Sequence, residues 1–79
     1  MKVWEVIRIT QELDGSNYVS MISEVFSTEK RAREYYNYLH DRMWQYADEV
    51  IDDDDWGFTT YEYSTPLKTM LSIQEKELQ

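Results

Sequence analysis

The fold of this chain is constrained most by one segment with helical periodicity. In the segments that flank it, apolar and polar residues alternate with a period of two. Between residues 32 and 50, apolar side chains recur at steps of three and four, which predicts one amphipathic helix. Residues 2–10, 18–26, 58–63 and 67–73 alternate instead, as strands with two different faces do. One helix has one apolar stripe to bury, and only a sheet is available to cover it. The sequence therefore predicts an α+β fold, with one long helix packed on one face of an antiparallel sheet.

Two strands are expected before the helix. Residues 2–10 are rich in Val, Ile and Trp on both faces, which indicates an inner strand. Residues 18–26 alternate as a second strand, and residues 14–17 have the composition of a turn. The pair is predicted to form an antiparallel hairpin.

The helix is expected to begin after Ser27 or Thr28, which can cap it, and to run to about Val50. The four aspartates at 52–55 are placed in a solvated loop, because adjacent carboxylates repel each other and Asp is a poor helix former. Residues 58–63 predict a third strand, which gives the order β-β-α-β.

The C-terminal segment fits two structures. Residues 67–73 alternate as a strand followed by a frayed tail, which is the favoured interpretation. Pro66 followed by Leu67, Met70 and Leu71 also fits a short capped helix.

The length of 79 residues predicts a single domain spanning 1–79. A domain this small buries a modest share of its surface, and without cysteine it has no disulfide to stabilise it. The small size, the twelve aromatic residues and the expected sheet edges favour a homodimer. No apolar run suits a signal peptide or a membrane span, so a cytoplasmic location is expected.

The acidic charge is concentrated in one part of the chain. The net charge is −8, and residues 41–63 hold eight carboxylates and one arginine, a net charge of −7. Such a segment attracts basic partners and repels nucleic acid and anionic membranes. The candidate partner-binding residues are Asp48, Glu49, Asp52, Asp53, Asp54, Asp55 and Glu62.

Enzymatic and metal-binding functions find no support in the residue pattern. With Gly57 at position six of a calcium-binding EF-hand loop, Trp56 and Tyr63 fall on positions that need oxygen ligands, so the match fails. His40, the single histidine, has no nucleophile in a recognisable motif and is expected on the helix surface or partly buried. No glycine-rich loop exists to hold phosphate. We expect no cofactor, no metal and no catalysis.

A fixed array of carboxylates on one side of a protein can offer a field similar to that of DNA, which carries about one charge per 1.7 Å of axis. A protein of this kind would compete with DNA for a basic groove, and its binding would weaken as salt rises. The sequence thus suggests a DNA mimic.

Three segments carry a resemblance to known proteins: VFSTEKRAREYYNYL (25–39), DEVIDDDDWG (48–57) and FTTYEYSTPL (58–67). With the small size and the acidity, they resemble the host-takeover proteins of lytic phages, most of all the DNA-mimicking inhibitors of the bacterial histone-like protein HU. The resemblance implies binding to a basic nucleoid protein in the host cytoplasm.

Two other functions stay open. A phage-type inhibitor or adaptor could bind another host protein, such as a polymerase, a protease chaperone or a division protein, through an aromatic face or a sheet edge. A structural or assembly subunit is the third class. Contacts of these kinds persist at high salt, whereas the contacts of a DNA mimic do not.

Overall fold

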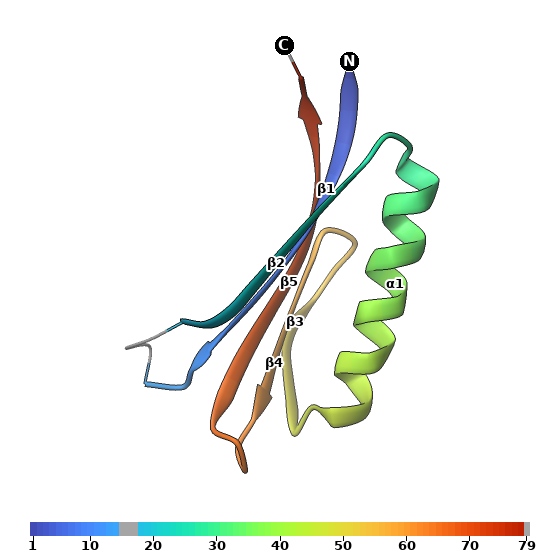
Figure 1. Cartoon of the computed structure of the whole chain (residues 1–79). Coiled ribbons are helices and arrows are strands. Elements are labelled where there is room, and N and C mark those ends of the chain that lie inside the picture. Colours follow the sequence, from blue (N-terminus) through green and yellow to red (C-terminus); the bar gives the residue numbers. More distant parts are fainter. Residues whose placement is uncertain (15–17, 79) are drawn as a thin grey trace.

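The computed structural model describes residues 1–14 and 18–78, which form one helix and five strands. The elements are β1 (Lys2–Glu12), β2 (Tyr18–Phe26), α1 (Glu29–Tyr46), β3 (Glu49–Asp53), β4 (Gly57–Glu62) and β5 (Leu67–Glu77). The strands make one sheet in the order β2-β1-β5-β4-β3, with every neighbouring pair antiparallel, and α1 lies along one face of it (Figure 1). The predicted α+β class is confirmed. The predicted order is incomplete, because the chain runs β-β-α-β-β-β.

The N-terminal hairpin has the predicted arrangement. Antiparallel pairing joins β1 and β2 from Trp4 opposite Phe26 to Gln11 opposite Tyr18. The inner position predicted for β1 is also confirmed, because β5 pairs with its other edge. The predicted turn at 14–17 falls mostly outside the described residues.

The C-terminal segment is a strand, and the alternative of a short helix is wrong. It pairs with β1 over the full length of both strands, and it continues past Ile73, where a frayed tail was expected, to Glu77. The N–H of Leu78 then donates to the carbonyl of Met1 at 2.8 Å. The long central pairing of β1 with β5 therefore places the two ends of the chain side by side (Figure 1).

The helix begins as predicted and ends four residues early. The hydroxyl of Thr28 accepts a hydrogen bond from the N–H of Arg31, which caps the first turn. Ala47 is already extended, so the helix stops at Tyr46 and does not reach Val50. Acidic residues at 48 and 49 would lie unfavourably at a helix C-terminus, where the dipole is negative, and this favours the early end.

The expectation of a loop at 52–55 is wrong for Asp52 and Asp53, which belong to β3. Pairing with β4 places Asp52 opposite Thr59 and Asp53 opposite Phe58, with an irregularity after Val50. Backbone hydrogen bonding to β4 outweighs the low strand propensity of aspartate, which depends strongly on context. The first two residues of the acidic run therefore lie in an edge strand, and Asp54 and Asp55 follow it in the turn to β4.

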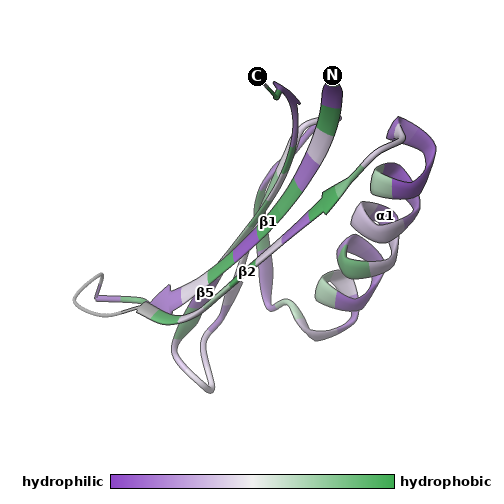
Figure 2. Cartoon of the chain, turned by 45° about the horizontal axis from the view of Figure 1, so that its top comes forward, coloured by the Kyte–Doolittle hydropathy of each residue, from purple (hydrophilic) through white to green (hydrophobic). Residues whose placement is uncertain are grey.

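The core lies between α1 and the sheet. Phe58, Leu71 and Val6 are at most 2% exposed and form its centre. The helix contributes the buried residues Ala32, Tyr36 and Leu39. Figure 2 shows the hydrophobic residues of α1 on the side towards the sheet. Tyr46, which the three- and four-residue spacing of 32–50 places in the same stripe, is the last residue of α1 and is 65% exposed.

The other face of the sheet has no element over it among the described residues. On β2 it exposes Val19, Met21 and Val25 by 55%, 65% and 55%. Ile7 and Ile9 of β1 extend this apolar area, since they lie opposite Ser23 and Met21. We call this surface the open face.

Candidate functional site

Six of the seven predicted site residues lie together at one edge of the sheet. They are exposed and belong to β3 or to the turns at its two ends: Asp48, Glu49, Asp52, Asp53, Asp54 and Asp55. We call this set the acidic edge. Glu62 lies on the neighbouring strand β4, half-buried and directed to the same side of the sheet as the helix, between two residues that hydrogen-bond to Asp48. Six of the candidate residues therefore line β3 and its turns, and the seventh is on the next strand.

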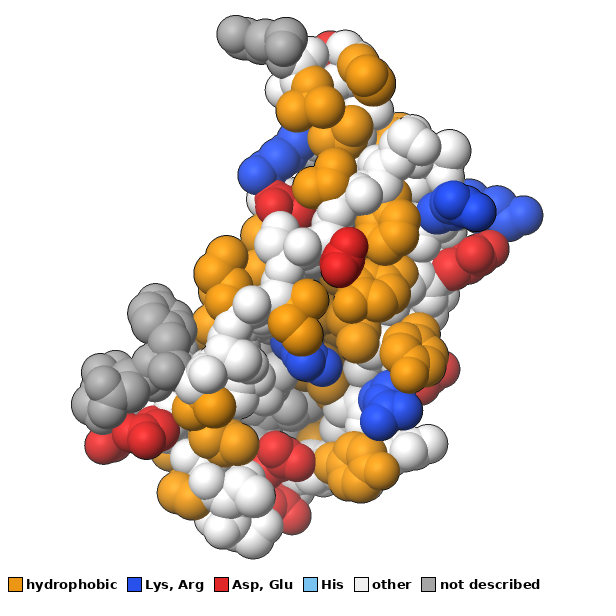
Figure 3. Space-filling model, viewed as in Figure 1, with side chains coloured by type: hydrophobic (Ala, Val, Ile, Leu, Met, Phe, Trp, Pro, Cys, Tyr) orange, Lys and Arg blue, Asp and Glu red, His pale blue; other side chains and the backbone are white. Residues whose placement is uncertain are grey.

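The acidic edge points to both sides of the sheet. Asp53 lies opposite Phe58, a core residue, and so is on the helix side, whereas Asp52 lies opposite Thr59 on the open side. The face shown in Figure 3 has its acidic side chains scattered among hydrophobic ones, with no single acidic patch. The negative charge accordingly forms a rim around β3.

One tyrosine fixes the first two carboxylates of the rim. The backbone N–H of Tyr63 donates to Asp48 Oδ2 at 2.7 Å, and its hydroxyl donates to Glu49 Oε2. The hydrogen bond to Glu49 raises the pKa of the Tyr63 hydroxyl. Both carboxylates are thus oriented by hydrogen bonds from Tyr63.

Two further carboxylates are held by the helix and by the turn after β3. Nε2 of His40 lies 3.0 Å from Asp53 Oδ1, and Trp44 Nε1–H donates to Asp53 Oδ2 at 3.4 Å. Oδ1 of Asp54 accepts hydrogen bonds from the N–H groups of Trp56 and Gly57, at 2.8 and 2.7 Å. Asp54 is therefore the residue that shapes the β3–β4 turn.

The side chains of Asp52 and Asp55 make no hydrogen bond or ion pair within the described residues, so their oxygens are available to a partner. The five residues of β3 span about 16 Å. The same length of DNA carries about ten negative charges. The five residues of β3 hold three of the six carboxylates, so the charge density of the strand itself is about a third of that of DNA, and the other three carboxylates extend the charged edge at its two ends.

Arg33 of the helix reaches the acidic edge. NH1 of Arg33 donates to the backbone carbonyl of Asp55 at 2.8 Å, and its guanidinium lies 5.7 Å from the ring centre of Trp56. The bond goes to the carbonyl, so it leaves the Asp55 carboxylate free. Arg33 holds the turn against the helix. Its positive charge makes the net charge of the acidic edge less negative by one.

Other kinds of site receive no support from the described residues. Among residues 1–14 and 18–78, no three histidine or acidic side chains converge to hold a metal ion. His40 is partly buried, with its ring 4.2 Å from that of Phe58, and it contacts carboxylates instead of a nucleophile. Within the same residues, no helix is long and apolar enough to cross a membrane.

The sequence did not indicate the residues that hold the carboxylates in place. Tyr63 and Trp44 were assigned to no site, because their hydrogen bonds depend on the pairing of β3 with β4 and on the helix end. The segment Asp54-x-Trp56-Gly57 is the sequence signal that indicates the fixed position of Asp54. Aspartate often accepts hydrogen bonds from the N–H groups two and three residues later.

Comparison with known proteins adds no assignment to this geometry: no protein-family model, no curated protein and no solved structure matches the chain.

Proposed function

We propose that the chain is an acidic inhibitor that occupies the DNA-binding surface of a basic host protein, such as the nucleoid protein HU. One observation carries the proposal: six exposed carboxylates line a single edge strand and its turns, and four of them are oriented by hydrogen bonds. Pre-oriented charges lose little conformational freedom when a partner binds. A cationic groove would gain favourable contacts from both sides of the rim.

The edge location also suits binding through charge. Carboxylates on an edge strand discourage other strands from pairing with it. The acidic edge consequently offers side-chain charge to a partner more readily than it offers backbone hydrogen bonds. Binding of this kind is steered electrostatically and weakens with salt.

The test compares two double variants that remove the same charge. Asp52→Asn with Asp55→Asn removes two carboxylates that have no structural hydrogen bond, so the fold should be kept. Glu24→Gln with Glu34→Gln is the control, because both residues are exposed and lie outside the acidic edge. Affinity for purified HU is measured by calorimetry at low and high salt, with duplex DNA as competitor.

We expect the first variant to bind about tenfold more weakly at low salt, and the control to match the unmodified protein. DNA should displace the bound protein. Equal affinities for the two variants, or binding that persists at high salt, would show that the acidic edge is not the contact.

The open face supports a second candidate, an inhibitor or adaptor that binds another host protein through apolar contact. Three β2 side chains that are more than half exposed are an unusual cluster for a strand in a protein this small. The same surface and the free edge of β2 are where we propose that two copies form a homodimer. Replacing Met21 with Lys should abolish both the apolar binding of another host protein and the formation of the homodimer. It should leave HU binding through the acidic edge unchanged.

A further inference from the structure

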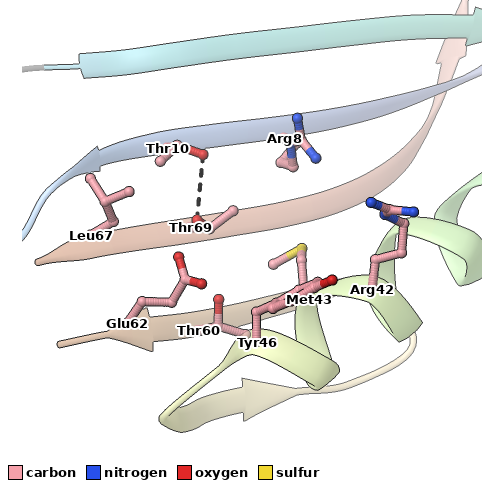
Figure 4. Close-up of a pocket in the computed structure, with 9 residues that line it drawn as sticks. All are labelled: Arg8, Thr10, Arg42, Met43, Tyr46, Thr60, Glu62, Leu67 and Thr69. Carbon is pink, nitrogen blue, oxygen red and sulfur yellow. Dashed lines mark hydrogen bonds between the residues drawn. The ribbon is translucent and has the colours of Figure 1, made fainter. Parts of the chain in front are cut away.

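A cavity lies between the sheet and the C-terminal half of α1, away from the acidic edge. Its volume is about 280 Å³, and its walls come from β1, β4, β5 and α1 (Figure 4). Two of its lining residues are arginines, Arg8 from β1 and Arg42 from the helix. Two guanidinium groups in one cavity are unexpected in a chain that has only eight lysines and arginines.

Arg8 is partly buried and makes no ion pair with any described residue. Its side chain is on the helix-covered side of the sheet, where Leu71 and Ile22 flank it on the neighbouring strands. Its Nε is buried and has no hydrogen-bond partner. Within the described residues no carboxylate lies within 4 Å of it. The covered Nε–H is a donor that lacks an acceptor, and an anion that entered the cavity could supply one.

Arg42 brings a second positive charge to the same space. NH1 of Arg42 donates to the Tyr38 hydroxyl at 3.3 Å, and the guanidinium lies 5.5 Å from the ring centre of Tyr38. These contacts orient the side chain without neutralising it. No ion pair to Arg42 occurs in the described part of the chain either. Arginine donors in a fixed plane suit carboxylate and phosphate oxygens.

The one carboxylate in the wall lies at the opposite end. Glu62 is opposite Leu67 on β5, whereas Arg8 is opposite Leu71, so four residues of strand, or about 13 Å, separate the two positions. Figure 4 shows Glu62 with Thr60 and Thr69 towards one end of the cavity and the two arginines towards the other. Thr69 Oγ1 lies 3.4 Å from Thr10 Oγ1, and each hydroxyl can make further hydrogen bonds.

We propose that this cavity binds a small organic oxyanion, a carboxylate or a phosphate, with its charged group between Arg8 and Arg42 and the rest of the molecule towards the threonine hydroxyls. The volume is at the lower limit for small-molecule pockets, which favours a ligand smaller than a nucleotide. This site is separate from the acidic edge, and its existence does not depend on the function proposed for that edge.

The test follows backbone amide signals by NMR while malonate or inorganic phosphate is added at constant ionic strength. Arg42→Gln and Arg8→Gln each remove one guanidinium of the cavity. Arg31→Gln is the matched control, because it removes the same charge from an exposed position at the other end of α1. Arg42 is exposed on the helix, so its variant should fold even if Arg8→Gln does not.

We expect saturable shifts confined to the cavity, including those of Thr60 and Thr69, with at least tenfold weaker binding in Arg42→Gln and unchanged binding in Arg31→Gln. Saturation by malonate alone assigns a carboxylic acid as the ligand, and saturation by phosphate alone assigns a phosphorylated compound. The proposal fails if neither anion saturates up to about 10 mM. It also fails if Arg31→Gln weakens binding as much as Arg42→Gln.

Discussion

Replacing Glu5 with glutamine should destabilise the protein at neutral pH and have little effect near pH 2. On the open face, the Glu5 carboxylate accepts from Lys76 Nζ at 2.5 Å, from Ser23 Oγ at 2.6 Å and from Gln74 Nε2 at 3.0 Å. These hydrogen bonds, that of Lys76 first, lower the pKa of Glu5 from 4.5 to about 2.

The size of the effect follows from that change in pKa. A folded-state pKa below the unfolded value stabilises the protein above pH 4.5, and this stability is lost as the pH falls from 4.5 towards 2. The full difference in pKa corresponds to about 3.4 kcal/mol. Lys76 is 48% exposed, so solvent screens the pair and we expect about 1 kcal/mol at pH 7.

Urea unfolding at pH 7, 4.5 and 2.5 measures the difference in free energy of unfolding between the unmodified protein and Glu5→Gln. Glu75→Gln is the control, because Glu75 forms an exposed ion pair with Lys2 on the same sheet and should change stability by less than about 0.5 kcal/mol. A difference for Glu5→Gln that is the same at pH 7 and pH 2.5 would refute the electrostatic reasoning.

Three further substitutions test the fold by urea unfolding. Phe58→Ala should cost about 3–5 kcal/mol, because it empties the centre of the core, and an effect below about 1 kcal/mol would contradict its burial. Thr28→Ala should cost about 1 kcal/mol through loss of the helix cap, measured also as lost helical circular dichroism. Asp54→Ala should cost about 1–2 kcal/mol through its two turn hydrogen bonds, whereas Asp52→Asn should be neutral.

Local patterns in the sequence predicted the elements that have clear periodicity. The alternation in residues 2–10 and 18–26 predicted β1 and β2, and the cap at Thr28 predicted the helix start. These features depend on contacts within a few residues or within one hairpin. The class of the fold follows from them, because one helix must cover one sheet face.

The end of the helix and the strand at 49–53 were not predictable from local patterns. Val50 continues the helical spacing of apolar residues, and aspartate disfavours strands, so both signals pointed away from β3. What decides the structure is the unpaired edge of β4, a contact made after the turn at 54–56. The same limit applies to the cavity, since Arg8 and Arg42 are brought together only by packing of α1 on the sheet.

The two edges of the sheet are chemically unlike, and this limits how far the sheet could grow. The β2 edge has a single charged residue, Glu24, whereas the β3 edge carries a carboxylate at three of its five positions. A second copy that pairs along β2 leaves a β3 strand at each outer border, where like charges would face any further copy. In the dimer proposed above, this charge would therefore oppose further growth of the sheet beyond two chains.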